Sequence, residues 1–540
     1  MAALTQQGAL LADTYGLDLL AYVCAADADA ISHRLAGEIQ LSERQEDVLT
    51  SLLALATQVA AATATVKRPV SLQLGWLGQF NESADTSNGN ALRFHAGGDV
   101  VLEIPDDPVC GPLVGMLRDA FPLLLVPPAP AFFQGPNLAS SLWSSPHRPA
   151  FEAAVLGDPD LSRLFTTESP GSGWTSLVYR STGSGSSLQL WSLPDLLLSG
   201  AWWRGQFMGD SGLSALAREL LASVDLLRRA ARGDSCEVPA FVAFTGVVLD
   251  GVDEIVVPFG LLRPVRDHER RLAPPSLQGQ LSHTPEGGDT VTVSYAGDVL
   301  LQSTMEYRLR VMADAIEPLA SWPLDLRAHE QFQRHVDTLR LAALLEGGPN
   351  TPLILTPTWR VVFDPLSWGP SLSWSDPRGA PSMTPRRVPP IVADRLADLA
   401  SAVHRHRRTK LDVAIRRTIS GMASRGDQVD ALVDLVIAWE SLFGSRRGEP
   451  TLRISAALGW LLGTTLDERE AYRGQAAKIY DLRSDIVHGN RDVPPQEASE
   501  ALTGARAITL AALAKLFTER TELLAMDTGD DRSRQLIMGP

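Results

Sequence analysis

From Ile391 to about Met526 the sequence consists of amphipathic helical segments joined by short connections. Apolar side chains in these segments recur every three or four positions, as Ile479, Leu482 and Ile486 do, which is the pattern of a helix that buries one face. Four to five such helices with short connections predict an all-α helical bundle over residues 391–527. The fold of the C-terminal part is therefore the most tightly constrained.

The preceding residues follow other patterns. A chain of 540 residues is too long for one hydrophobic core, so several domains are expected. Residues 1–125 are rich in Ala and Leu and predict a helical region, in which Gly37 ends a short helix and Ser42 and Gln45 have the capping-box spacing of the next helix start. Residues 126–390 combine an alternating strand pattern at 291–297 with a helical pattern at 214–232, which predicts a mixed α/β region. Within it, 271–289 resembles a polar loop and 366–390 a linker.

Composition limits the class of protein. The formal net charge is −15, with 63 acidic residues against 48 Lys and Arg, which argues against a surface that coats nucleic acid or an anionic membrane. The three cysteines are scattered, as expected in a reducing cytosol. The most apolar run, 121–133, is interrupted by prolines, so we expect a cytoplasmic protein without a membrane span.

One short stretch of the C-terminal region, YDLRSDIVHGN at 480–490, places an arginine five residues before a histidine near a helix end. Arg483 and His488 follow an apolar stripe, and Gly489 is placed to end the helix. The spacing has little weight alone, because Arg263 and His268 repeat it beside Pro264. Ser484 and Asp485 lie within a turn of His488 and can support its ring.

An earlier helix carries carboxylates that need partners. Glu440 shares a face with Val436 and other apolar residues, and a carboxylate in such a stripe requires an opposite charge. Arg453 and Arg483 are both possible partners. Asp430 and Asp434 lie one turn apart on the adjacent face.

Three segments in order, ALVDLVIAWESLFG at 431–444, LRISAALGWLLG at 452–463 and IYDLRSDIVHG at 479–489, resemble the Apea-like HEPN domain family. The resemblance covers about 391–526, and Trp439 is bulkier than the family pattern. It implies a metal-independent endoribonuclease without cofactors, with Arg483 and His488 catalytic and Glu440 and Asp434 as supports. It also implies a homodimer through this domain and a role in antiphage defence by abortive infection.

The chemistry of these side chains agrees with that activity. A histidine can move the 2′-hydroxyl proton near neutral pH, and a fixed guanidinium can stabilise the pentavalent phosphate. One helix places the two groups about 140° apart, so two facing chains would be needed to bring them to one phosphate. The expected products are a 2′,3′-cyclic phosphate and a 5′-hydroxyl.

A substrate track and other functions are also suggested by the sequence. The segment 404–425 is strongly basic, and either an RNA-binding surface or a solvated helix face fits it. Its candidate RNA-binding residues are Arg405, Arg407, Arg408, Lys410, Arg416 and Arg417. Residues 25–49 weakly resemble the helix-turn-helix of Xre-type antitoxin-like proteins, which would place Ser32, His33 and Arg34 on an exposed recognition helix. A plain helical scaffold is the simpler interpretation.

The first 390 residues contain no nucleotide-binding loop and no metal-ligand spacing, so they suit a sensing module for a phage-derived or nucleic-acid trigger. Two alternatives from other classes remain. One is a non-catalytic HEPN scaffold that dimerises and recruits a partner, and the other is a DNA-binding regulator.

Overall fold

The fold is that of a computed structural model, which describes residues 4–66, 74–127, 136–169, 173–182, 185–285, 288–312, 326–349, 351–380, 384–445, 449–489 and 492–539. The chain divides into two compact units. Unit 1 comprises 1–238, 306–326 and 363–371, and unit 2 comprises 239–305, 327–362 and 372–540. The predicted limits at 125 and 390 thus lie within unit 1 and unit 2, respectively.

Unit 1 is mainly helical, and its described residues also form a four-stranded sheet and a two-stranded hairpin. Its helices are α1 (Gln6–Tyr15), α2 (Leu17–Val23), α3 (Ala28–Leu35), α4 (Glu43–Val66), α6 (Asn88–His95), α7 (Cys110–Leu124), α8 (Ala139–Ser144), α9 (Arg148–Gly157), α10 (Leu193–Met208) and α11 (Leu213–Arg232). The sheet has the order β13 (Leu309–Met312), β4 (Gly173–Arg180), β3 (Thr167–Ser169), and β5 (Gly185–Gln189) also pairs with β4. The short strands β1 (Phe80–Asn81) and β2 (Thr86–Ser87) form a hairpin.

The predicted helix boundaries near the N-terminus are confirmed. α4 starts at Glu43, directly after Ser42, whose backbone N–H and hydroxyl both donate to the Gln45 side chain at 3.0 and 2.8 Å. Gly37 follows α3 with a φ of 80°, a left-handed conformation that glycine adopts without steric cost. Capping residues thus fix both boundaries.

The sheet of unit 2 has six strands. Their order is β15 (Ser371–Trp374), β14 (Thr356–Val362), β6 (Cys236–Thr245), β12 (Val299–Tyr307), β9 (Gly260–Pro264) and β8 (Ile255–Val257). β6, β12 and β15 each cross the boundary between the units along the chain. The prediction of a mixed α/β middle region is confirmed.

Two segments predicted as loop and linker contain strands instead. In 271–289, β10 (Gln280–His283) pairs with β11 (Val291–Ser294), and the hydroxyls of Ser282 and Thr292 are 2.8 Å apart. In 366–390, β15 forms an edge of the large sheet and β16 (Arg386–Val388) pairs in parallel with β7 (Val247–Leu249). These strands are short and mostly polar, so their pairing depends on tertiary contacts that composition does not reveal.

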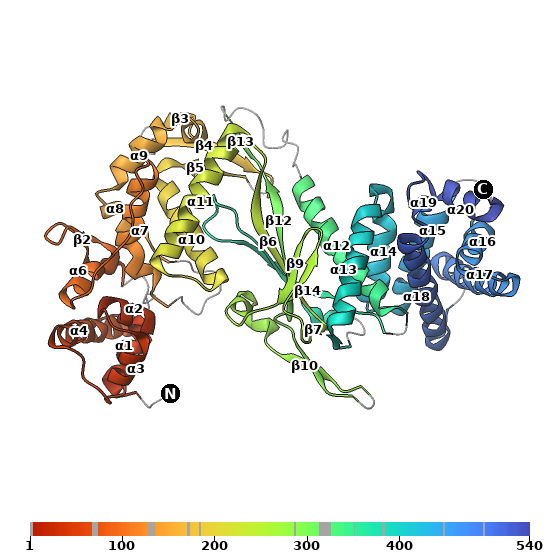
Figure 1. The fold of residues 1–540 in the computed structure, drawn as a ribbon, viewed down its shortest axis with the longest axis horizontal. Helices are drawn as coiled ribbons and strands as arrows, with labels where there is room; N and C mark the ends of the chain where they lie inside the picture. The colour runs from red at the N-terminus through yellow and green to blue at the C-terminus, as the bar shows by residue number, and fades with distance from the viewer. Residues whose placement is uncertain are drawn as a thin grey trace. The chain divides into compact units, whose positions relative to one another are not determined.

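The predicted all-helical C-terminal part is confirmed, and it extends past residue 527 (Figure 1, teal to blue). Its helices are α13 (Pro390–His406), α14 (Asp412–Ala423), α15 (Gln428–Phe443), α16 (Pro450–Leu462), α17 (Leu466–His488), α18 (Pro495–Thr518), α19 (Thr521–Leu524) and α20 (Gly529–Met538). α12 (Arg327–Gly347) packs on α13 and α14. We call α12 to α20 the bundle.

The core of the bundle accommodates the unexpected tryptophan. Trp439 on α15 is fully buried, and its indole N–H donates to Thr509 Oγ1 on α18 at 2.8 Å. This bond satisfies the one polar atom of the ring, as burial of tryptophan requires.

α18 is the one helix among the described residues that is long and apolar enough to span a membrane. Of its most apolar window, 56% is buried in the bundle, as in the core helix of a soluble protein.

Candidate functional site: the C-terminal end of α17

The two ends of α17 are fixed by local sequence. At its start, the Thr465 side chain accepts from the Glu468 backbone N–H, and the Glu468 carboxylate accepts from the Thr465 backbone N–H, which forms a capping box. At its end, Gly489 has a φ of 64° and its N–H bonds to carbonyls of the last turn. The predicted termination at Gly489 is confirmed, so Arg483 and His488 lie in the last two turns of a long, rigid helix.

Arg483 is held by Glu440 of α15. Its Nη2 lies 3.4 Å from Glu440 Oε2, and the Tyr480 hydroxyl donates to Glu440 Oε1 at 2.7 Å. Burial, together with this bond to Glu440, raises the pKa of Tyr480 to about 12. Of the two possible partners for Glu440, Arg483 is the one that pairs, because Arg453 binds Asp530 at 2.7 Å.

The guanidinium of Arg483 is only partly used by this contact. Its side chain is 18% exposed, and its Nε is buried without an acceptor among the described residues. A partly exposed, positioned guanidinium with spare donors is suited to bind an oxyanion.

His488 is more exposed to solvent than Arg483. It is the last residue of α17 and its side chain is exposed to solvent, whereas Ser484 and Asp485 on the preceding turn are half-buried. Arg483 precedes His488 by five positions, or about 140° around the helix, so a single chain presents the two groups on different sides of α17.

Asp434 is placed away from this pair. It is buried on α15 and accepts from Arg417 Nη1 at 2.5 Å, Ser420 Oγ at 2.6 Å and Arg425 Nε at 3.0 Å. Burial acts to raise the pKa of Asp434, but the hydrogen bonds from Ser420, Arg425 and Arg417 outweigh it and lower the pKa below its ordinary value. Asp434 therefore joins α14 to α15 and makes no hydrogen bond to α17 within the described residues.

The basic segment 404–425 is not a continuous positive surface. The guanidinium of Arg407 is 4% exposed and pairs with Asp412 at 2.8 Å and Asp337 at 3.7 Å, so the prediction that it contacts RNA is corrected. Asp337 belongs to α12, 70 residues before Arg407, so the local sequence around Arg407 could not predict this ion pair. Lys410 pairs with Asp527 at 2.7 Å, and Arg417 pairs with Asp434.

Three of the six predicted RNA-binding residues remain exposed without an ion pair among the described residues: Arg405, Arg408 and Arg416. Two of them lie where α13 ends and one lies on α14. A phosphate track built from this segment would use these three side chains.

The second copy of the Arg-x4-His spacing has a structural role. Arg263 Nη2 and Nη1 contact the fully buried carboxylate of Glu269 at 2.5 and 2.9 Å. Both guanidinium and carboxylate are shielded from solvent, so this arginine is committed to a buried ion pair.

The candidate recognition residues near the N-terminus are also paired with acids. Arg34 forms a two-pronged contact with Glu46 at 2.6 and 2.7 Å, and His33 Nδ1 lies 2.6 Å from Glu38. Ser32 is half-buried on the same helix. The basic charge that DNA phosphates would require is therefore locally neutralised.

Tyr480 is a site residue that the sequence analysis did not select. It precedes Arg483 by three positions, and this helical spacing was the available signal that both reach the same carboxylate. Within the described ranges, no group of three His, Cys, Asp or Glu side chains is arranged to hold a metal ion.

No family model, no curated protein and no solved structure matches the chain.

Proposed function

We propose that the chain is a metal-independent endoribonuclease of the HEPN type, with Arg483 and His488 as catalytic residues. The observation that carries the proposal is the contrast at the end of α17. Arg483 is oriented by Glu440 with donors to spare, and His488 is open to solvent five residues later. A fixed cation and an accessible proton carrier are the two groups that metal-free RNA cleavage needs.

The roles follow from the chemistry of each side chain. His488 accepts the proton of a 2′-hydroxyl, whose oxygen attacks the adjacent phosphorus and displaces the 5′-oxygen. The 5′-oxygen takes a proton from water and leaves as a hydroxyl, and a 2′,3′-cyclic phosphate remains on the other product. Arg483 donates to the non-bridging oxygens as negative charge accumulates on them. Glu440 is a positioning residue that orients Arg483, and Ser484 and Asp485 lie between Arg483 and His488 along α17.

We further infer that the active form is a homodimer and that the protein acts in antiphage defence. Two facing copies of α17 would bring the Arg483 of one chain and the His488 of the other to one phosphate. The residues before the bundle, which are divided between unit 1 and unit 2, carry no recognised catalytic motif, and this suits control of a toxic nuclease by an infection signal.

The test compares RNA cleavage by the full chain and its variants. Purified wild type, Arg483→Ala and His488→Ala are incubated with total RNA in EDTA, and the 3′ ends are analysed for cyclic phosphate. We expect at least a hundredfold loss of cleavage in both variants, as removal of a general base or an oxyanion donor typically causes. Growth after induction in a bacterial host provides a parallel readout.

Matched controls come from the same chain. Arg473→Ala removes an exposed arginine earlier on α17, and His268→Ala removes the histidine of the second Arg-x4-His copy. Both should cleave RNA like the wild type. If the wild type and the Arg483 and His488 variants all fail equally under infection, or all cleave equally, a non-catalytic scaffold is the better description.

A further inference from the structure

A segment of unit 1 between α6 and α7 has the pattern of a β-strand but no partner strand. No turn or bend interrupts 98–105. Val101 and Ile104 are β-branched, and Pro105 favours extended conformations at the residue before it. Leu102 packs against the core of unit 1, whereas Val101 is 79% exposed. This alternation is that of a strand with one face on a core.

The backbone of this segment is open to pairing. Among the described residues, the N–H and carbonyl groups of Val100–Ile104 make no hydrogen bond. Five residues of extended chain span roughly 17 Å, which is an ordinary length for a strand. An unpaired row of backbone groups is a template to which another strand can add.

Both ends of the segment are held by neighbouring helices. At its start, the Asp99 carbonyl accepts from Arg93 Nε of α6 at 2.7 Å. At its end, the Pro105 carbonyl oxygen lies so close to Gly111 of α7 that a Cβ at this glycine would meet it at 3.0 Å. The segment is therefore pre-organised, and a partner strand would lose little binding free energy in ordering it.

The exposed face of the segment is acidic. Asp99 and Glu103 lie two positions before and after Val101, so the three side chains share one face, and all three are exposed. Neither carboxylate forms an ion pair within the described ranges, and the same holds for the exposed Asp106 just beyond the segment. The face thus presents an apolar side chain between two unpaired negative charges.

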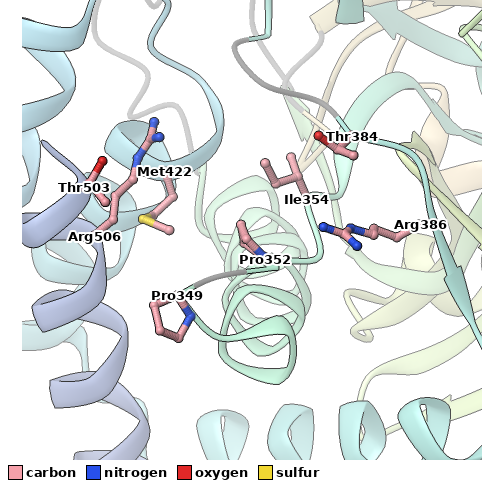
Figure 2. Close-up of a pocket in the computed structure, with 8 residues that line it drawn as sticks. All are labelled: Pro349, Pro352, Ile354, Thr384, Arg386, Met422, Thr503 and Arg506. Carbon is pink, nitrogen blue, oxygen red and sulfur yellow. The ribbon is translucent and has the colours of Figure 1, made fainter. Parts of the chain in front are cut away.

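A cavity of about 270 Å³ in unit 2 offers no comparable arrangement (Figure 2). Its two arginines, Arg386 and Arg506, line opposite walls, with Pro352 and Ile354 between them. Arg506 Nη2 donates at 3.3 Å to the Gly421 carbonyl in the last turn of α14, where carbonyl groups lack partners within the helix. Arg506 therefore stabilises a helix end, and the two arginines do not form one site.

We propose that residues 99–104 bind an extended segment of a partner protein, which adds as a strand and carries lysine or arginine opposite Asp99 and Glu103. Backbone hydrogen bonds to Val100–Ile104 supply the affinity, and the two charge pairs supply the specificity. An apolar side chain of the partner packs on Val101.

The charges also decide against a second copy of this segment as the partner. In an antiparallel pair centred on Val101, Asp99 of each chain would lie opposite Glu103 of the other, and like charges directly opposite one another are destabilising. The same carboxylates repel nucleic acid. A basic strand from another protein is the occupant that the charge pattern favours.

The test measures binding of short labelled peptides to the full chain by fluorescence polarisation. The probe is Thr-Lys-Thr-Val-Thr-Lys-Thr, which places a basic, an apolar and a basic side chain on one face. One comparison peptide has Glu in place of both Lys, and the other has Pro in place of Val. We expect the lysine peptide to bind and each comparison peptide to bind about tenfold more weakly, because charge pairs or backbone bonds are lost. Amide hydrogen exchange at Val100–Ile104 should slow when the lysine peptide is added.

Variants of the chain separate strand addition from nonspecific attraction. Val101→Pro removes a backbone donor, so it should weaken binding about tenfold without lowering the unfolding midpoint, since this N–H has no partner in the folded chain. Glu103→Lys should make the glutamate peptide the tighter ligand. Glu237→Lys reverses an exposed charge on β6 and should bind like the wild type, as should Arg483→Ala in the proposed nuclease site.

The outcomes that would overturn the proposal are specific. They are no binding of the lysine peptide, binding that survives Val101→Pro, and exchange protection outside 99–104 only. Equal binding of the lysine and glutamate peptides would overturn the basic partner. A dimer that dissociates in Val101→Pro without any peptide would identify a second copy as the occupant and would overturn the proposal as well.

Discussion

Two carboxylates of α15 show how single residues set the geometry of the bundle. Asp434 is surrounded by three donors from α14 and the residues after it, whereas Glu440 shares its oxygens between Tyr480 and Arg483 of α17. The Asp434 carboxylate is thus fully occupied by protein donors. Arg483, in contrast, keeps its Nε without an acceptor among the described residues. The sequence predicted that Glu440 needs a cation but not which one, since the choice between Arg453 and Arg483 depends on how α16, α17 and α20 pack.

His335 is the residue for which the structure predicts the clearest pH dependence. It lies on α12, stacked on Phe259 with ring centroids 4.9 Å apart, and near His404, Arg407 and Arg334. Burial, followed by the positive charges of His404, Arg407 and Arg334, lowers the pKa of His335 from 6.5 to about 4. Its Nδ1 is buried without an acceptor among the described residues.

The sign of the effect follows from linkage. Between pH 6.5 and pH 4 the unfolded chain binds a proton at His335 that the folded chain does not, so the free energy of unfolding falls as the pH falls through this window. The loss is at most about 3 kcal/mol from this group. We expect the urea midpoint of unit 2 to decrease from pH 7 to pH 4.5, and to decrease less in His335→Gln.

The control for this pH effect is His33→Gln, which replaces an exposed histidine in unit 1. It should retain the wild-type slope of the urea midpoint against pH. An identical slope in His335→Gln would mean that other groups cause the acid sensitivity.

At the scale of elements, helix boundaries were predictable and short strands were not. Ser42, Gln45 and Gly489 act through bonds and backbone angles within one turn, so the local sequence contains the whole cause. β10 and β16 depend on partners that lie far from them or on polar cross-strand contacts, and their own residues carry no apolar alternation. The bundle was predicted to end at 527, before α20. α20 is a mostly polar helix whose position depends on contacts with distant residues such as Ser441 and Leu442.

A buried arginine, Arg532, joins α20 to the end of α15, in addition to the Arg453–Asp530 ion pair. Arg532 is 2% exposed, and its guanidinium donates to the carbonyls of Leu442 at 2.7 Å, Ser441 at 3.0 Å and Met526 at 3.1 Å. Leu442 and Ser441 belong to the last turn of α15, where carbonyl groups have no partners within the helix. A cation at this end also interacts favourably with the helix dipole.

We therefore expect Arg532→Ala to lower the free energy of unfolding of unit 2 by about 3 kcal/mol, because three carbonyls lose a charged donor. Arg532→Lys should be intermediate, since an ammonium lacks the planar fork. The measurement is urea unfolding followed by far-UV circular dichroism. Arg534→Ala, on the same helix but 63% exposed and paired with Asp530, should change the value by less than about 1 kcal/mol. Equal effects at the two positions would show that α20 contributes no specific anchor.

At the scale of the whole molecule, each unit is assembled from segments that are distant in the sequence. Residues 363–371 return to unit 1, where Asp364 accepts from Thr182 Oγ1 at 2.9 Å and from the Tyr307 hydroxyl at 3.0 Å. Burial, together with the neighbouring Asp364 carboxylate, raises the pKa of Tyr307 far above its ordinary value. Domain limits drawn from composition divide the chain into consecutive pieces. They could not predict that 363–371 joins unit 1 after a stretch of unit 2, because a change in composition can mark a linker but does not show which unit a segment packs against.

The proposed active site also exceeds what one chain can form. Arg483 and His488 lie about 140° apart around α17, so the proposed chemistry requires the arginine of one chain and the histidine of another. This requirement predicts complementation between two inactive variants. When Arg483→Ala and His488→Ala chains carrying different affinity tags are co-expressed and purified through both tags, each mixed dimer retains one Arg483 and one His488.

We expect this mixed dimer to recover a measurable fraction of RNA cleavage, up to about half of the wild-type rate if one of two equivalent Arg–His pairs is intact. Each variant purified alone should stay inactive, and mass measurement by light scattering should give twice 58.2 kDa for all of them. A mixed dimer carrying Arg483→Ala in both chains and His488→Ala in one is the negative control. Activity that never returns, in a complex shown to be dimeric, would mean that the two side chains act within one chain or not at all, and the shared-site mechanism would have to be abandoned.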